Sequence, residues 1–203
     1  MKALLADLDG TLADTAPGLV AAAIAAAESL GAELLERDVA KLRPAAAQGA
    51  TRLLTAMVGH HPADLLVENM LDHYEAIIAD QTRLFPGTES WLALPRFAIV
   101  TNKPWRFARH LLGSVLPAEV LLVCPDHAGA RKPDPAPVTF ALERLGVRPE
   151  QAVLVGDDPA DRDAAVRAGG VGFVAALWGY GAGAWMDEGF AKAASPADVQ
   201  AFL

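Results

Sequence analysis

The chain has 203 residues, enough for one large domain or for one domain that carries a smaller one. Its hydrophobic content of 53% argues against disorder, and its net charge of -8, with no basic run, argues against nucleic acid as a partner. Few apolar residues precede Asp7, too few for a signal peptide or a membrane span, and a single cysteine, Cys124, cannot form an internal disulfide. We therefore expect a cytoplasmic protein without membrane contact, either a monomer or a homodimer.

The first apolar run, Leu4 to Ala6, predicts a buried strand that ends at Asp7. No strand pattern follows between Thr15 and Phe85. Helices are expected there instead: one from Thr15 through Ala21 to Ser29 that ends at Gly31, one over roughly Ala45 to Met57, and one after Pro62 with Leu66, Met70, Tyr74, Ile77 and Ile78 on one face. Such an insertion is too long for a loop. We expect a helical cap domain over 15–85, inserted into a core domain made of 1–14 and 86–203.

After the insertion, apolar runs alternate with helical patterns. The expected strands are Phe97 to Val100, Val120 to Val123, Val153 to Val155 and Val171 to Leu177, and the expected helices are Trp105 to Leu112, Pro137 to Leu145 and Pro159 to Ala168. This alternation predicts an α/β fold with a Rossmann-like, doubly wound parallel sheet.

Reactive or polar groups follow four of the predicted strands, where ligands bind in parallel α/β sheets. These groups are Asp7 and Asp9 in Asp7-Leu8-Asp9-Gly10-Thr11, then Thr101-Asn102-Lys103, then Lys132 between prolines in Arg131-Lys132-Pro133-Asp134-Pro135, and finally Gly156-Asp157-Asp158 with Asp161. Carboxylates suit a hard cation such as Mg²⁺, and a hydroxyl and an ammonium suit phosphate oxygens. The pattern indicates a metal and phosphate site.

These four motifs, in this order, resemble those of the haloacid dehalogenase superfamily, and most closely its phosphoglycolate phosphatase group. The resemblance covers essentially the whole chain. It includes the helical insertion, Phe85-Pro86-Gly87 and Trp178-Gly179-Tyr180-Gly181.

The resemblance implies a phosphatase that works through an aspartyl phosphate on a small phosphomonoester, with the cap closing over the substrate. Asp7 is then the nucleophile and Asp9 the proton donor and acceptor. Mg²⁺ is held by Asp7, the backbone of Asp9 and Asp157, while Thr101 and Lys132 bind phosphoryl oxygens. Gly10 and Asn102 are also expected next to the substrate. Asp161 is expected to support the metal or Lys132.

One departure from the family pattern concerns the metal site. Asp158 stands where relatives usually have Ser or Thr. Two interpretations remain open: this extra carboxylate strengthens metal binding, or it points away.

Substrate choice depends on the cap. Arg43 precedes a segment that is similar to the part of the family's cap facing the active site. An arginine there suits a substrate carboxylate, as in phosphoglycolate. A solvated arginine at a helix end is the equally good alternative.

Two other functions use similar residues. A phosphosugar mutase returns the phosphoryl group to its substrate, and a phospho-acceptor signalling module of the receiver type does not hydrolyse a substrate. In receivers the phosphorylated Asp lies on a later strand and no helical insertion is present, so the order of motifs favours the hydrolase.

Overall fold

The computed structural model describes residues 2–185 and 189–203, except for the side chains of residues 182 and 184. The chain divides into two compact units. One consists of Met1–Ala13 and Leu84–Leu203, and the other of Asp14–Arg83. In this division the inserted unit starts one residue earlier and ends two residues earlier than the expected cap.

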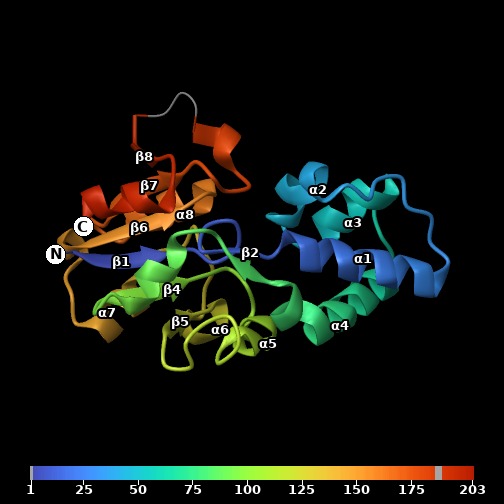
Figure 1. Cartoon of the computed structure of the whole chain (residues 1–203), viewed down its shortest axis with the longest axis horizontal. Coiled ribbons are helices and arrows are strands. Elements are labelled where there is room, and N and C mark those ends of the chain that lie inside the picture. Colours follow the sequence, from blue (N-terminus) through green and yellow to red (C-terminus); the bar gives the residue numbers. More distant parts are fainter. Residues whose placement is uncertain (1, 186–188) are drawn as a thin grey trace. The chain divides into compact units, whose positions relative to one another are not determined.

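The larger unit contains a six-stranded sheet in the order β5-β4-β1-β6-β7-β8, and every neighbouring pair is parallel (Figure 1). The strands are β1 (Ala3–Ala6), β4 (Phe97–Val100), β5 (Leu121–Val123), β6 (Ala152–Gly156), β7 (Gly172–Ala176) and β8 (Ala191–Ala193). This confirms the predicted α/β fold with a parallel sheet. The strand β8 was not expected, because three residues of mixed polarity give no strand pattern.

The strands form where apolar residues are continuous because both faces of the sheet are covered. Every residue of β1, β4 and β6 is buried. Within the sheet, Leu5 lies opposite Ala98 of β4 on one side and Leu154 of β6 on the other. The first strand of the chain therefore lies in the middle of the sheet.

Helices connect these strands and pack against them. The α-helices of this unit are α5 (Trp105–Ala108), α6 (Pro125–Ala128), α7 (Ala136–Leu145) and α8 (Pro159–Arg167), and the 3-10 helices are η1 (Thr88–Ala93), η2 (Arg109–Leu111), η3 (Pro149–Gln151), η4 (Ala182–Trp185) and η5 (Pro196–Phe202). Helix α7 packs against β4 and β5, and α8 against β6 and β7. The single helix expected over Trp105 to Leu112 is instead α5 followed by η2.

The strand order reverses at β1, because β4 and β5 extend the sheet on one side and β6 to β8 on the other. In open α/β sheets, ligands bind outside the carboxyl ends of the strands at such a reversal. The fold therefore directs attention to the residues that follow β1, β4 and β6.

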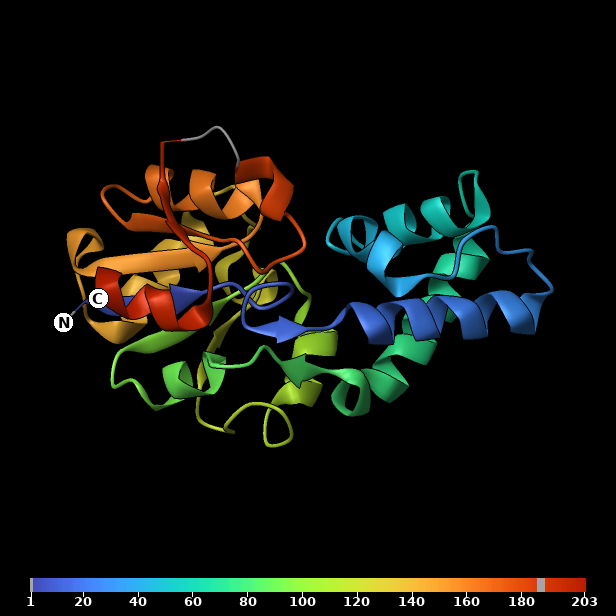
Figure 2. The same ribbon diagram turned by 45° about the horizontal axis from the view of Figure 1, so that its top comes forward.

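The smaller unit is made of four helices, α1 (Ala16–Leu30), α2 (Val39–Ala46), α3 (Ala50–Val58) and α4 (Asp64–Gln81). Figure 2 shows α1, in blue, alongside α4, in green. Gly18 allows this approach, because a Cβ there would come within 3.0 Å of Gln81 Cβ. Helix α1 ends at Gly31 with a φ of 66°, as predicted.

The expected helix over Ala45 to Met57 was wrong. The chain forms two helices there, α2 and α3, which are separated by residues 47–49. Gly49 has a φ of 94°, which a helix does not allow. The two short strands β2 (Ala13–Asp14) and β3 (Arg83–Leu84) pair with each other where the chain enters and leaves this unit.

Among the residues that the structure describes, we find no helix with the length and apolar character needed to cross a membrane.

Candidate active site

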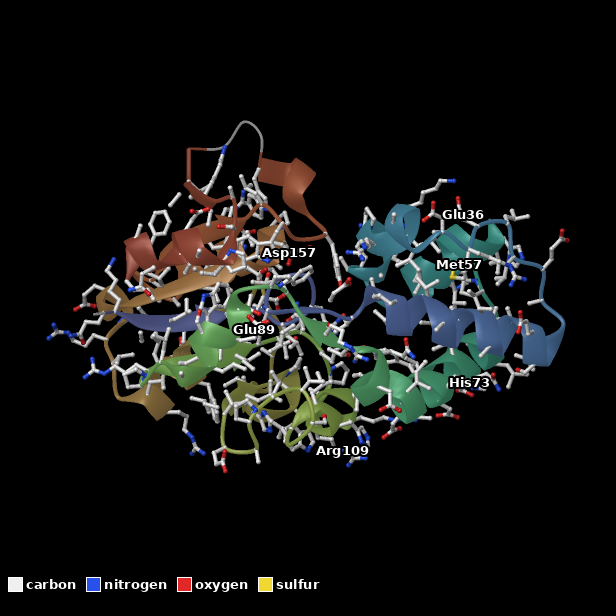
Figure 3. The ribbon with its side chains drawn as sticks, in the orientation of Figure 1. Glu36, Met57, His73, Glu89, Arg109 and Asp157 are labelled. Carbon is white, nitrogen blue, oxygen red and sulfur yellow. The ribbon has the colours of Figure 1, made fainter. Side chains whose placement is uncertain are left out.

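Three neighbouring strands end in the residues that the sequence singled out. Asp7 follows β1, Thr101 follows β4, and Asp157, which is labelled in Figure 3, follows β6. Backbone hydrogen bonds continue past the strands, because Asp7 N donates to Val155 O at 2.9 Å and Thr101 N donates to Val123 O at 3.0 Å. All three side chains are buried. The sheet therefore brings them to the same edge.

Lys132 reaches this edge from the segment between α6 and α7. Its Nζ donates to Asp7 Oδ1 at 2.6 Å, to Asp161 Oδ1 at 2.5 Å and to the carbonyl oxygen of Val100 at 2.6 Å. The residue is only 3% exposed. An ammonium group that is desolvated to this degree is stable only when paired, and two carboxylates provide that pairing.

Asn102 fixes the backbone of Lys132. The Nδ2 group of Asn102 donates to Lys132 O at 2.9 Å, and Lys132 N donates to Asn102 Oδ1 at 2.8 Å. Both polar atoms of the amide are thus bonded to one residue. The side chain of Asn102 positions Lys132, and the role expected for Asn102 in binding substrate stays a prediction.

Asp157 is held from two directions. Its Oδ1 accepts from the Thr11 hydroxyl at 2.9 Å, and its Oδ2 accepts from the backbone nitrogens of Tyr180 at 2.8 Å and Gly181 at 3.1 Å. The indole nitrogen of Trp185 also donates to its backbone oxygen at 3.1 Å. These bonds fix the direction of the carboxylate.

Two glycines allow this close wrapping. A Cβ on Gly10, which has a φ of 89°, would lie 2.6 Å from Asp157 Oδ2, and a Cβ on Gly179 would overlap Asp157 Cβ. The amide of Gly10 donates to Ala13 O at 2.9 Å. The structure therefore gives Gly10 a place in packing around Asp157, and its expected contact with substrate stays a prediction.

Asp158 and Asp161 begin helix α8. Asp158 is its N-cap and accepts from Ala160 N at 2.8 Å through Oδ1. Asp161 accepts from Asp158 N at 3.1 Å through Oδ2, and its Oδ1 accepts from Lys132. Asp161 thus supports Lys132 directly. Asp158 is occupied as a helix cap, which explains how an acid is accommodated at this position.

Asp9 has a different partner from Asp7. Its Oδ1 lies 2.9 Å from Nζ of Lys103, a buried residue in the turn after β4. The backbone nitrogen of Lys103 donates in turn to the hydroxyl oxygen of Thr101 at 3.0 Å. Because this oxygen accepts from the turn, the hydroxyl hydrogen of Thr101 can be donated to a ligand.

Burial dominates the electrostatics of the cluster. It raises the pKa of Asp7 and of Asp157 to about 7 and that of Asp161 to about 6, partly offset by Lys132 for Asp7 and Asp161 and by hydrogen bonds for Asp157. Burial alone lowers the pKa of Lys132, but the charges of Asp161 and Asp7 outweigh it and raise this pKa above its usual value. Lys132 is therefore a permanent cation at neutral pH.

The donor set fits a divalent cation. One carboxylate oxygen from each of Asp7, Asp157 and Asp161 lies within 4.8 Å of the others. With Lys132, the fully ionised group carries a net charge of minus two, in a buried place. A hard cation of charge two neutralises it, and oxygen ligands are those that Mg²⁺ prefers. The sequence expected Asp161 only as a support, whereas the geometry places its carboxylate beside those of Asp7 and Asp157.

Arg43 pairs within its own unit. Its Nη2 lies 2.7 Å from Asp14 Oδ2, and both side chains are partly exposed. Arg43 belongs to α2, whose last residues include Pro44. Its expected contact with substrate stays a prediction.

Sequence reasoning gave no role to Thr11, to Lys103 or to the backbone of Tyr180 and Gly181. Thr11 and Lys103 stand inside motifs that were recognised, so their position was a usable signal. The contact of Tyr180 and Gly181 with Asp157 depends on backbone amides, which every residue type carries, and the sequence gave no sign of it. Cys124 is fully buried, and burial raises the pKa of its thiol to about 12.

The acidic cluster, the fixed lysine and the strand-end hydroxyl lie where the strand order of the parallel sheet reverses. This combination is typical of one class of hydrolases. A model of the haloacid dehalogenase-like hydrolase family matches residues 1–169. The chain belongs to this family, as the four motifs predicted.

Relatives refine this assignment. The phosphoglycolate phosphatase of Xanthomonas campestris pv. campestris is 39% identical over 189 residues, which cover 88% of this chain and 84% of the relative. The N-acetylmuramic acid 6-phosphate phosphatase of Pseudomonas aeruginosa is 35% identical over 191 residues, which cover 89% and 83%. The crystal structure of a haloacid dehalogenase (HAD) family hydrolase from Deinococcus radiodurans, with bound phosphate and sodium, has a TM-score of 0.76 at 23% identity and covers 100% of this chain and 94% of that chain. The predicted likeness to phosphoglycolate phosphatases is confirmed.

Proposed function

We propose that the protein is a Mg²⁺-dependent phosphatase that hydrolyses a small phosphomonoester through an aspartyl phosphate. The observation that carries this proposal is the convergence of Asp7, Thr101 and Asp157 with Lys132 at one edge of the sheet. Phosphoryl transfer needs positioned charge more than it needs new covalent chemistry, and this cluster provides it.

The reaction proceeds in two displacements. A carboxylate oxygen of Asp7 attacks phosphorus, the bond from phosphorus to the substrate oxygen breaks, and Asp9 gives a proton to the departing alkoxide. Water then attacks the phosphorus of the aspartyl phosphate, Asp9 takes a proton from that water, and inorganic phosphate leaves while the Asp7 carboxylate is regenerated. Splitting a very slow hydrolysis into two positioned steps lowers its overall barrier.

Other groups stabilise the charge on the transferring phosphoryl group. Lys132 presents a permanent ammonium, and Thr101 presents a hydroxyl hydrogen. Asp7, the backbone of Asp9 and Asp157 would hold Mg²⁺, and the Asp161 carboxylate lies close enough to those of Asp7 and Asp157 to contribute. When bound, Mg²⁺ neutralises negative charge on the phosphoryl oxygens and on the nucleophile.

For the substrate we favour phosphoglycolate. The relative from Pseudomonas aeruginosa supports a second candidate, N-acetylmuramic acid 6-phosphate. Both compounds combine a phosphomonoester with a carboxylate, and Arg43 is the residue that we assign to recognise this carboxylate. A cytoplasmic location, and a monomer or homodimer that binds no nucleic acid, remain predictions from the sequence.

The decisive experiment measures phosphate release from phosphoglycolate, N-acetylmuramic acid 6-phosphate, several sugar phosphates and a nucleotide, each with Mg²⁺ and with EDTA. We expect turnover of a carboxylate-bearing ester that stops with EDTA. An isomerised sugar phosphate without free phosphate would instead identify a mutase. Stable labelling of the protein by a small phosphodonor, without turnover of any ester, would identify a phospho-acceptor module.

A further inference from the structure

Lys103 is a lysine in an unusual place. Its side chain is 6% exposed, whereas lysines are almost never buried unless paired. Its Nζ lies 2.9 Å from Asp9 Oδ1, so the buried ammonium is compensated by the carboxylate to which we assign proton transfer. Neither Lys132 nor its carboxylate partners are part of this pair.

The turn that carries Lys103 fixes its position. The backbone nitrogen of Lys103 donates to the Thr101 hydroxyl oxygen at 3.0 Å. Asn102, the residue between them, is bonded twice to the backbone of Lys132. Each residue of this turn therefore has its own place in the site. Thr101 carries a hydroxyl that can bind a ligand, Asn102 fixes the backbone of Lys132, and Lys103 contacts Asp9.

We propose that Lys103 is a positioning residue for proton transfer by Asp9, an inference that rests on the function proposed above. The carboxylate of an aspartate can rotate about the bond between Cβ and Cγ. The contact of Lys103 with Oδ1 restricts that rotation and holds the carboxylate in one orientation for proton exchange with the leaving group. Small misplacements of a reacting group cost about 10²-fold in rate, so this restraint has a measurable effect.

The proposal makes a prediction that depends on the leaving group. An alkoxide is a strong base and needs a proton as it departs, whereas p-nitrophenolate is a weak base and departs without one. Loss of Lys103 should therefore lower kcat/KM for an alkyl phosphate and leave kcat/KM for p-nitrophenyl phosphate nearly unchanged, because kcat/KM reports formation of the aspartyl phosphate and not the later attack by water, which both esters share. A residue that only maintains the fold would affect both esters alike.

The test compares Lys103→Met with wild-type protein on p-nitrophenyl phosphate and on the best alkyl ester from the panel above. We expect kcat/KM for the alkyl ester to fall about 10²-fold and kcat/KM for p-nitrophenyl phosphate to change by less than about 3-fold. Lys103→Arg should recover part of the loss. Lys41→Met is the matched control, since Lys41 is exposed and pairs with Glu36, and its rates should equal those of the wild type.

Asp9→Asn separates the two proposals. If Asp9→Asn shows no preference for the better leaving group, the role of Asp9 in the proposed function is wrong. If Asp9→Asn shows that preference while Lys103→Met lowers kcat/KM for both esters equally, or for neither, the inference about Lys103 alone is overturned. Should Lys103→Met fail to fold, Lys103→Gln replaces it under the same two outcomes, with circular dichroism and the thermal shift by Mg²⁺ as measures of an intact site.

Discussion

Thr11 donates its hydroxyl hydrogen to Oδ1 of Asp157 at 2.9 Å, although 146 residues separate them in the chain. Thr11 belongs to the loop after β1, and Asp157 follows β6. This bond orients the Asp157 carboxylate, whose other oxygen accepts from two backbone amides. Mutation of a group that orients a metal ligand in this way typically costs about 10- to 100-fold in metal affinity or activity.

Thr11→Val should weaken Mg²⁺ binding about 10- to 100-fold, because Asp157 loses a bond that fixes its direction. The Mg²⁺ dependence of activity and the Mg²⁺-induced thermal shift both measure this. Thr88→Val is the control: Thr88 is also buried, but its hydroxyl donates to the backbone oxygens of Leu12 and Phe85. It should lower stability by about 1–2 kcal/mol and leave Mg²⁺ affinity unchanged. Equal Mg²⁺ affinity in both variants would contradict the role of Thr11.

Gly179→Ala should destabilise the protein and impair the site, because the new Cβ would overlap Asp157 and approach the backbone oxygen of Gly10. We expect a loss of about 1–3 kcal/mol in the free energy of unfolding, measured by urea denaturation, together with weaker Mg²⁺ binding. Among the residues that the structure describes, a Cβ on Gly183 meets no atom within 4 Å, so Gly183→Ala serves as the control. Similar stability of the two variants would show that the loop does not pack on Asp157 as described.

Asp7→Asn should abolish turnover, by on the order of 10³-fold or more, because an amide is a poor nucleophile. Release of phosphate measures the loss, and acid-stable incorporation of phosphate into the wild-type protein, absent from the variant, supports the covalent step. Asp163→Asn makes the same chemical change in helix α8 at a partly exposed residue that pairs with Arg162. Wild-type activity in Asp7→Asn would disprove the assigned nucleophile.

Arg43→Ala should raise KM for phosphoglycolate about 10-fold or more and leave p-nitrophenyl phosphate, which has no carboxylate, unaffected. Arg37→Ala is the matched control in the same unit, since Arg37 pairs with Glu28 at the surface. Equal KM values for phosphoglycolate in the two variants would rule out the assigned contact between Arg43 and the substrate carboxylate.

Stability without metal should fall as pH rises from about 4 to 7. Asp7 and Asp157 have pKa values raised from 3.8 to about 7, and Asp161 to about 6, so the folded state retains protons that the unfolded state has lost. Each group titrates at its unfolded-state pKa and at its higher folded-state pKa. Between these two values it lowers the free energy of unfolding by up to about 1.4 kcal/mol per pH unit.

Urea denaturation at pH 5 and at pH 7 in EDTA measures this slope. Mg²⁺ binds the ionised carboxylates and should reduce the slope, with the largest gain in stability at the higher pH. A metal-free protein that becomes more stable over this range would contradict the unfavourable burial of these charges.

The sequence allowed the sheet and the reactive side chains to be predicted, because each buried strand reads as an apolar run and each reactive group stands directly after one. The meeting of Asp7, Thr101 and Asp157 at the strand ends was predicted in this way, and the fixed position of Lys132 was predicted from the prolines around it. Their roles in catalysis and metal binding stay predictions.

What the sequence did not show depends on tertiary contacts or on backbone groups. The amide of Asn102 is chemically suited to a substrate, and only the fold shows that the Lys132 backbone uses it. The pattern over Ala45 to Met57 looks continuous, and the break is decided by the backbone conformation at Gly49. The strand β8 is ordered by pairing with β7, which its own residues do not indicate.

The pairing of β2 with β3 gives the chain a modular construction. The inserted unit of residues 14–83 begins and ends on two strands that are bonded to each other. Its two ends are therefore adjacent, and a different insert with equally close ends could be joined at the same place without changing the order of the sheet. Asp7, Asp9, Thr101, Lys132 and Asp157 all lie outside the insert. The insert that contains Arg43 can thus change, in evolution or by design, without a change in the residues to which we assign phosphoryl transfer.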